Sequence, residues 1–280
     1  MSESVLYVVS TPIGNLGDMT PRAVEVLGSV DIIAAEDTRY SKRLLSHFGI
    51  NVRLISCHEH NERYQTAKII ERLHHGESVA LISDAGTPLI SDPGYYLVRK
   101  VREAGINVIA VPGACAIIAA LSISGLATDR FYFEGFLPAK ASRRKKKLDE
   151  LSDMLCTWGF YESTHRIRDS IDDCLEVLGA NRYIVLVREI TKKFETVLAG
   201  SIEQVQNILQ NDAAQCKGEF VVLVEGNKSI SSSLICSNAK TLLAHLLKEL
   251  PIKKAVAIVA DMYGHQKKEL YNLALTLKQG

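Results

Sequence analysis

The chain has 280 residues, of which 47% are hydrophobic and 23% charged, and its net charge is +1. This composition is typical of globular proteins and excludes disordered, collagenous and low-complexity chains, while the length suits two domains and an appendage. Residues 227–280 hold eight lysines against three acidic residues, so this end is basic. The excess indicates a bound polyanion, although a lysine-rich solvated surface would give the same charge.

The cysteine pattern and the N-terminus bear on the compartment. The six cysteines lie far apart, with no C-x-x-C pair, which favours reduced thiols over a disulfide framework. The first residues lack the basic start and long apolar run of a signal peptide, and no apolar run reaches the ~20 residues of a membrane span. We therefore expect a cytoplasmic protein without membrane association.

Strand and helix patterns alternate through the first part of the chain. A strand at 5–9 leads through a breaker-rich segment into a helix that Thr20 and Pro21 open. Further strands are expected at 31–35, 53–55, 79–82 and 108–111, and helices at 40–48, 63–74, 95–104 and from Pro112 to about Gly125. This alternation predicts an α/β domain over residues 1–125 with a mainly parallel sheet.

The pattern changes after residue 125. Strands are expected at 131–136, 158–161, 183–187, 196–200 and 220–224, and helices at 143–154, 166–178 and 202–211. The short connection within residues 185–200 predicts some antiparallel pairing, so residues 126–226 form a second α/β domain with a mixed sheet. A serine-rich linker at 227–233 precedes three short helices, and residues 227–280 are expected to form a small helical domain.

Unusual loops follow four strands of the first domain. They read T-P-I-G-N-L-G from Thr11, E-D-T-R from Glu36, S-D-A-G-T-P-L-I-S-D-P-G from Ser83 and P-G-A-C from Pro112. All four are expected at the carboxyl edge of the sheet, where open parallel sheets bind ligands. Glycine and proline can serve turns alone, but Asp, Ser and Thr gathered at one edge favour a binding site.

These segments resemble a known family. T-P-I-G-N-L, A-E-D-T-R, S-D-A-G-T-P-L-I-S-D-P-G, P-G-A, E-G-F-L-P, F-Y-E-S-T-H-R and R-E-I-T-K together resemble the ribosomal RNA small subunit methyltransferase I family of tetrapyrrole-methylase-like enzymes. The resemblance runs from about Leu6 to the C-terminus. It implies two α/β domains with S-adenosylmethionine in the cleft between them, a homodimer, and 2′-O-methylation of a cytidine in small-subunit ribosomal RNA.

The resemblance places the methyl donor on the first domain. Asp84 is expected to offset the cationic sulfonium and amino group of the donor. Small and apolar residues would surround it, although each of Ile90, Cys115 and Phe136 alone fits core packing as well. The expected donor-binding residues are Pro12, Ile13, Gly14, Asp84, Ala85, Gly86, Thr87, Ile90, Pro112, Gly113, Ala114, Cys115 and Phe136.

A ribose hydroxyl is a weak nucleophile, so its methylation needs positioning and is helped by proton removal. Among Asp37, Glu162, His165 and Glu189, we predict Glu162 and Glu189 as the catalytic carboxylates, because each lies at a second-domain strand where it could face the cleft. The alternatives are a structural carboxylate paired with a neighbouring arginine, or catalysis by positioning alone.

Two further segments stand out. Cys57-His58-Glu59-His60 looks like a metal site, but a second ligand cluster is missing, and a polar rim that caps a helix or contacts RNA fits better. No metal site is therefore predicted. Thr157-Trp158-Gly159-Phe160 departs from the smooth apolar strand of similar sequences, and we expect it to change packing more than chemistry.

Basic residues indicate where RNA would bind. A helix that begins with cations is opposed by its own dipole, so the run Arg143, Arg144, Lys145, Lys146 and Lys147 favours phosphate binding over surface decoration. Lys253, Lys254, Lys267 and Lys268 flank a helix–turn–helix pattern that resembles the appendage of the same family. A solvated lysine-rich surface explains these four equally well.

Three functions remain open from the sequence. The first is the RNA ribose methyltransferase, acting on free ribosomal RNA or on the assembled small subunit. The second is a methylase of a small tetrapyrrole-like molecule, and the third is a non-catalytic RNA-binding protein. The basic segments favour RNA over a macrocycle, and intact donor loops favour an enzyme.

Overall fold

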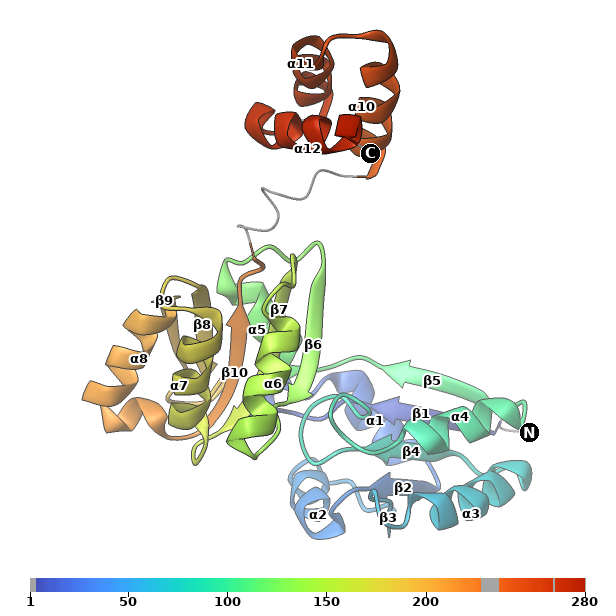
Figure 1. The fold of residues 1–280 in the computed structure, drawn as a ribbon. Helices are drawn as coiled ribbons and strands as arrows, with labels where there is room; N and C mark the ends of the chain where they lie inside the picture. Colours follow the sequence, from blue (N-terminus) through green and yellow to red (C-terminus); the bar gives the residue numbers. More distant parts are fainter. Residues whose placement is uncertain (1–3, 228–236, 264, 280) are drawn as a thin grey trace.

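The computed structural model describes residues 4–227, 237–263 and 265–279. Figure 1 shows two α/β domains and, apart from them, three helices at the C-terminal end. Within the described part of the chain, no helix has the length and apolar character needed to span a bilayer.

The first domain is built on a parallel sheet. Its strands have the order β3-β2-β4-β1-β5, and every pairing is parallel, as predicted. The strands are β1 (Val5–Val9), β2 (Ile32–Ala35), β3 (Arg53–Ser56), β4 (Val79–Ile82) and β5 (Asn107–Val111). The inner strands β2 and β4 are buried along their whole length, which explains why they read as continuous apolar runs.

Helices cover both faces of this sheet. The helices α1 (Pro21–Ser29) and α2 (Thr38–His47) pack on one face, and α3 (Glu62–His74) and α4 (Tyr95–Glu103) pack on the other. The start of α1 follows from its sequence, because the Thr20 side chain accepts a hydrogen bond from the Ala23 N–H and Pro21 occupies the first turn. A short 3₁₀ helix, η1 (Leu16–Asp18), lies between β1 and α1.

The second sheet is mixed, as predicted. Its order is β6-β7-β10-β8-β9, with β6 and β7 parallel and the other pairs antiparallel. The strands are β6 (Phe131–Phe136), β7 (Thr157–Ser163), β8 (Tyr183–Arg188), β9 (Thr196–Ser201) and β10 (Glu219–Val224). The helices of this domain are α5 (Ala116–Ser124), α6 (Ala141–Leu151), α7 (Ile167–Leu178), α8 (Ile202–Asn211) and the 3₁₀ helix η2 (Ala213–Cys216).

Helix α5 joins the second domain although it directly follows the last strand of the first. Its Ile117, Ala120 and Leu121 share a buried cluster with Val185, Val187, Val221 and Leu223 of the second sheet. Packing thus assigns α5 to the second core, against the sequence-based division at residue 125. We propose residues 112–115 as the boundary, where the chain crosses from one core to the other.

The bulky rings and the glycine in residues 157–160 of β7 are explained by what packs against each face of the strand. Trp158 and Phe160 are fully buried, with ring centroids 6.0 Å apart, in the core that α6 and α7 cover. On the other face, a Cβ at Gly159 would lie 2.9 Å from the Val222 carbonyl and 3.2 Å from Ile117. The glycine therefore lets α5 approach the sheet, so this departure serves packing, as expected.

The C-terminal helices form their own core. They are α10 (Ser237–Glu249), α11 (Ile252–Tyr263) and α12 (Lys267–Gln279). Their buried cluster is made of Ala239, Leu243, Leu247, Ala255, Val256, Val259, Ala260, Leu270 and Ala274. The three predicted helices are thus confirmed, whereas the predicted serine-rich linker lies, apart from Asn227, outside the described residues.

Candidate active site

Three loops at the carboxyl edge of the first sheet are bonded together. Thr11 and Gly86 exchange backbone hydrogen bonds of 2.8 and 3.1 Å. The Thr87 hydroxyl lies 2.9 Å from the Ser10 hydroxyl and donates to the Ala114 carbonyl at 3.0 Å. The loops after β1, β4 and β5 therefore form one surface, as their position at the sheet edge predicts.

Glycines allow the close approach of these loops. Gly86 has a φ of 86°, and a Cβ there would lie 3.2 Å from the Ile13 side chain. A Cβ at Gly113 would lie 2.8 Å from that of Ser10, closer than side-chain carbons approach. Larger residues would push the loops apart, so the small-residue surface depends on both positions.

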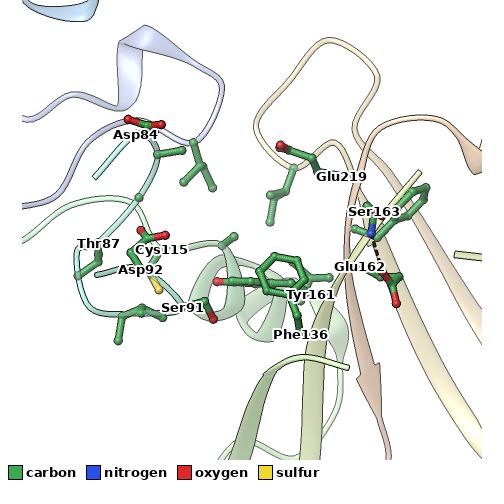
Figure 2. Close-up of a pocket in the computed structure, with 18 of the residues that line it drawn as sticks. Asp84, Thr87, Ser91, Asp92, Cys115, Phe136, Tyr161, Glu162, Ser163 and Glu219 are labelled. Atoms are coloured by element: carbon green, nitrogen blue, oxygen red, sulfur yellow. Dashed lines mark hydrogen bonds between the residues drawn. The ribbon is translucent and has the colours of Figure 1, made fainter. Parts of the chain in front are cut away.

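A cavity of about 380 Å³ opens between this surface and the second sheet (Figure 2). Its size lies within the range of small-molecule sites. The lining residues come from both α/β domains and are Ile13, Asp84, Ala85, Gly86, Thr87, Ile90, Ser91, Asp92, Cys115, Ala116, Phe136, Tyr161, Glu162, Ser163, Ile190, Lys192, Glu219, Phe220 and Val221.

The structure brings most of the predicted donor residues to this cavity. Those that line it are Ile13, Asp84, Ala85, Gly86, Thr87, Ile90, Cys115 and Phe136. The predicted residues outside the lining are Pro12, Gly14, Pro112, Gly113 and Ala114. The second group shapes the loops, since Gly113 lets them close and the Ala114 carbonyl bonds to Thr87.

Carboxylates gather on the first-domain side of the cavity. Asp84 accepts a hydrogen bond of 3.0 Å from the Asp37 N–H, which joins the loops after β2 and β4. Burial raises the pKa of Asp92, partly offset by a hydrogen bond from Ser83 and reinforced by the charge of Asp84. Burial, followed by the charges of Asp92, Asp84 and Asp37, also raises the pKa of Glu36. A bound cation would therefore stabilise the charged form of these carboxylates on the first-domain side of the cavity.

Aromatic rings form the floor of the cavity. The Tyr161 ring meets those of Phe133 and Phe136 edge to face, with centroids 4.7 and 5.6 Å away. The Tyr161 hydroxyl accepts a hydrogen bond of 3.1 Å from the Ile117 N–H at the start of α5. Burial raises the pKa of Tyr161, so it remains a neutral phenol, while Phe136 stays 55% exposed and can stack on a planar ligand.

A segment between β8 and β9 reaches across to the first domain. Thr191 donates a hydrogen bond to Asp18, and a Cβ at Gly14 would lie 2.5 Å from the Lys192 side chain. The Lys192 ammonium lies 3.0 Å from Glu189 and 2.7 Å from Glu219. Gly14 therefore gives space to a residue of the other domain, and the close donor approach expected of it from the sequence stays a prediction.

The structure corrects the expectation that Glu162 faces the cleft. Glu162 is among the lining residues, but its carboxylate points away from Asp84 and Asp92 in Figure 2. That carboxylate is fully buried and accepts hydrogen bonds from Ser170 at 2.6 Å and Arg166 at 3.2 Å. These contacts fit the alternative of a structural carboxylate.

Glu189, unlike Glu162, lies outside the cavity lining. Its carboxylate accepts hydrogen bonds of 3.0 Å from the Glu219 N–H and from Lys192. Burial would raise the pKa of Glu189, but these bonds and the charges of Lys192 and Arg188 lower it overall. A carboxylate with a lowered pKa is a weak base, so Glu189 is suited to holding Lys192 and Glu219 in place.

Among the lining residues that the sequence did not single out, four carry titratable side chains: Asp92, Tyr161, Lys192 and Glu219. The first three belong to the motifs S-D-P-G, F-Y-E-S-T-H-R and R-E-I-T-K, which were recognised, but a neighbouring residue was chosen. Strand alternation could have corrected one choice: Trp158, Phe160 and Glu162 share the apolar face, which leaves Tyr161 for the cleft. Glu219 precedes an apolar strand and had no such signal.

The cations of the basic run in α6 lie in three different environments. The Arg144 guanidinium is buried and lies 2.6 Å from Asp173, so it does not contact RNA in this structure, which corrects the prediction at that position. Lys145 pairs with Glu176 at 2.6 Å and Lys147 with Glu150 at 3.1 Å. Arg143 and Lys146 are exposed.

The C-terminal helices hold a second cavity of about 430 Å³ between α11 and α12. Lys253, Lys267 and Lys268 line it together with Tyr271 and Asn272, while Lys254 is exposed outside it. Three lysines beside a tyrosine provide charge for phosphates and a ring for a base.

The Cys57–His60 segment gathers no ligand set. The rings of His58 and His60 lie edge to face with centroids 5.9 Å apart, and Cys57 is buried. Across residues 4–227, 237–263 and 265–279, no three His, Cys, Asp or Glu side chains are placed to hold a metal ion.

Comparison with known proteins shows where this chain belongs. Residues 5–206 match the Tetrapyrrole (Corrin/Porphyrin) Methylases, and residues 237–278 match a C-terminal helix-turn-helix domain named for RsmI. Ribosomal RNA small subunit methyltransferase I of Haemophilus influenzae is 53% identical over 97% of this chain and 96% of its own. The protein of that name from Escherichia coli O157:H7 is 50% identical over 98% and 96%.

Solved structures show the same fold at low sequence identity. A cobalt precorrin-4 methyltransferase has a TM-score of 0.57 and 14% identity over 80% of this chain and 95% of its own. A uroporphyrin-III-C-methyltransferase from Thermus thermophilus has a TM-score of 0.52 and 18% identity over 84% and 100%. The chain has the tetrapyrrole methylase fold and belongs to the ribosomal RNA small subunit methyltransferase I family.

Proposed function

We propose that this protein transfers a methyl group from S-adenosylmethionine to the ribose 2′-hydroxyl of a cytidine in small-subunit ribosomal RNA. The observation that carries the proposal is the cavity between the two α/β domains, lined by eight of the residues that the family resemblance assigns to the donor. Near-full-length relatives of that name favour this function over methylation of a small tetrapyrrole.

The residues present fit the donor. S-adenosylmethionine supplies an activated methyl group on a cationic sulfonium. Asp84 and Asp92 offer negative charge on the first-domain wall, which suits that cation. The small surface around Gly86 admits a ligand close to the backbone, and the exposed ring of Phe136 provides a stacking face for the adenine.

We assign proton removal to Glu219. Asp84 and Asp92 belong to the first domain, whereas Glu219 lies across the cavity on the second (Figure 2). Because the displacement is in line, the acceptor hydroxyl has to approach from the side opposite the donor-holding residues. The side chain of Glu219 is 81% exposed and its carboxylate lies 2.7 Å from the Lys192 ammonium, so it can take the proton from the hydroxyl and release it to solvent.

The activity is tested by incubating the full chain with labelled donor and isolated small subunits, bare ribosomal RNA or a porphyrinoid. We expect label in RNA. Label in the porphyrinoid alone would support the second function, and donor binding without transfer to any acceptor would support the non-catalytic one.

Glu219→Gln tests the assignment of the proton acceptor. We expect donor and RNA affinity to be retained and single-turnover methylation to fall about 10²–10⁴-fold, because glutamine keeps the shape and loses the basicity. Glu162→Gln is the matched control on the neighbouring strand: it should lower the melting temperature, since it disturbs a buried charged network, and leave the rate unchanged. A wild-type methylation rate in Glu219→Gln would show that Glu219 does not remove the proton, and would favour catalysis by positioning of the substrates alone.

The assembly and the compartment follow from the same proposal. The family resemblance implies a homodimer, and Phe131 and Tyr132 on the edge strand β6, with Ile118 and Ile123 on α5, offer exposed apolar side chains for it. Light scattering should give twice the chain mass. The ribosomal substrate implies activity in the cytoplasm.

A further inference from the structure

We infer that the outer face of α3 and α4 is a docking platform for unpaired nucleotides that flank the target cytidine. The inference rests on the proposed RNA substrate and adds a surface that neither the donor cavity nor the basic segments include. The platform consists of Arg63, Tyr64 and Lys68 on α3 and Tyr95, Tyr96 and Lys100 on α4.

Tyrosines and cations alternate on this face. Tyr64 and Tyr95 are 64% and 65% exposed, although tyrosines are usually half buried. The Lys68 ammonium lies 4.3 Å from the Tyr64 ring centroid, and the Arg63 guanidinium lies 5.6 Å from that of Tyr96. Exposed rings with cations beside them are the means by which proteins bind single-stranded nucleic acids, the rings stacking on bases and the cations pairing with phosphates.

The charges on the platform suit a polyanion. Lys100 is bound to Glu103 at 2.6 Å, but no carboxylate lies within ion-pair distance of Arg63 or Lys68 in the part of the chain that the structure describes. Tyr64 and Tyr95 are the large hydrophobic residues exposed on α3 and α4, with no exposed Leu, Ile, Val, Met or Phe beside them. Lysines are depleted in protein interfaces, so Lys68 and Lys100 beside the tyrosines favour RNA over a second copy of the chain.

The platform begins beside the active site. Asp92 lines the cavity and Tyr95 opens α4 three residues later, so their Cα atoms lie at most about 11 Å apart. The two helices are joined at this end, because the Glu62 carboxylate accepts a hydrogen bond of 3.1 Å from the Leu97 N–H. A strand with its target ribose in the cavity can therefore continue onto a surface that is already rigid.

The test uses two double variants of the full-length protein. Tyr64→Ala with Tyr95→Ala removes the stacking rings, and Arg63→Ser with Lys68→Ser removes the two cations that lack ion pairs. All four side chains lie on the solvent side of their helices, so the fold and donor affinity should be retained. The matched control is Tyr40→Ala with Lys42→Ser and Arg43→Ser on α2, exposed residues on the helix layer of the opposite sheet face.

Binding is measured by anisotropy with a labelled single-stranded RNA and with a duplex of the same sequence. We expect the tyrosine variant to lose at least about 10-fold in affinity for the single strand and little for the duplex, since a stacked base contributes about 1–3 kcal/mol. The cation variant should reduce the slope of log affinity against log salt by about 1.4, which corresponds to two phosphates. The control should bind like wild type.

Several outcomes would overturn the platform. Wild-type RNA affinity in both double variants, an equal loss in the control, or conversion of a dimer to a monomer in the variants would each contradict it. The proposed function is judged separately by methylation with the wild-type chain: transfer to RNA by wild type together with unchanged binding by the variants refutes the platform alone. Wild-type protein without affinity for either RNA refutes both.

Discussion

At the scale of single residues, two carboxylates at and beside the cavity lie in surroundings that disfavour their charged form. Asp92 and Glu36 lie close to Asp84 and Asp37, and burial raises the pKa of both. Such crowding costs stability unless a cation is bound. Asp37 is different, because the Arg39 side chain holds the pKa of Asp37 at about 2.

Asp92→Asn should therefore separate stability from binding. The pKa of Asp92 is higher in the folded than in the unfolded chain, so the folded state binds more protons and stability falls as the pH rises through this range. At neutral pH the substitution removes that cost, and we expect a higher melting temperature with weaker S-adenosylmethionine binding. Calorimetry and thermal melts check this, and a lower melting temperature with unchanged donor affinity would contradict it.

The same residues give the expected pH dependence. Protonation of Asp92 removes negative charge from the side of the cavity that is expected to face the donor, so donor affinity of the wild-type protein should fall as the pH drops through the raised pKa of Asp92. In Asp92→Asn the fall should be smaller. Titration calorimetry across the mildly acidic range measures the donor affinity of both proteins. The same dependence of affinity on pH in wild type and Asp92→Asn would show that Asp92 does not contribute to donor binding.

At the scale of elements, periodicity predicted the strands and helices well, because each α/β unit carries its own alternation and breakers. Periodicity did not predict which side chain of an element is buried, or against which neighbouring element it packs. The buried Arg144 shows this, since a helix of consecutive cations reads as an exposed surface until Asp173 of α7 is placed against it. The placement of α5 likewise depends on which sheet receives its apolar face, and no local signal encodes that choice.

Helix α6 yields a prediction that distinguishes its cations. Arg144→Ser removes the 2.6 Å partner of the buried Asp173 and leaves it only Lys145 at 3.6 Å, so we expect a loss of up to about 3–5 kcal/mol in the free energy of unfolding. Arg143→Ser with Lys146→Ser should leave stability unchanged and flatten the salt dependence of RNA binding. Denaturant melts and salt titrations measure the two effects. Equal stability of both variants would contradict the structural role of Arg144.

At the scale of the whole molecule, the cavity of the α/β domains and the lysine-lined cavity of the C-terminal helices lie on different units. The donor cavity joins the two α/β domains, whereas Lys253, Lys267 and Lys268 belong to helices with a separate core. Family resemblance identified both units from the sequence. The residues that cross between domains, Lys192 over Gly14 and Thr191 to Asp18, could not be predicted, because their partners are more than 170 positions away in the chain.

Substitution of Lys253, Lys267 and Lys268 by serine tests this separation. We expect RNA affinity to fall with a flatter salt dependence, since about three fewer phosphates are neutralised, and donor affinity to stay at the wild-type value. Calorimetry with the donor and anisotropy with RNA measure the pair. A parallel loss of donor binding would show that the C-terminal helices act on the cleft.

The central position of β10 has a consequence for synthesis of the protein on the ribosome. The first sheet has all its strands once Val111 has left the exit tunnel, so it can form early. The second sheet cannot, because β10, its last strand in sequence, lies between β7 and β8 and links them. Until residues 219–224 emerge, the apolar face of α5 has no complete sheet to cover. During that time the nascent chain consists of a folded first domain followed by an incomplete second domain whose apolar core residues are exposed to solvent. That interval is when chaperone binding to this chain should be strongest.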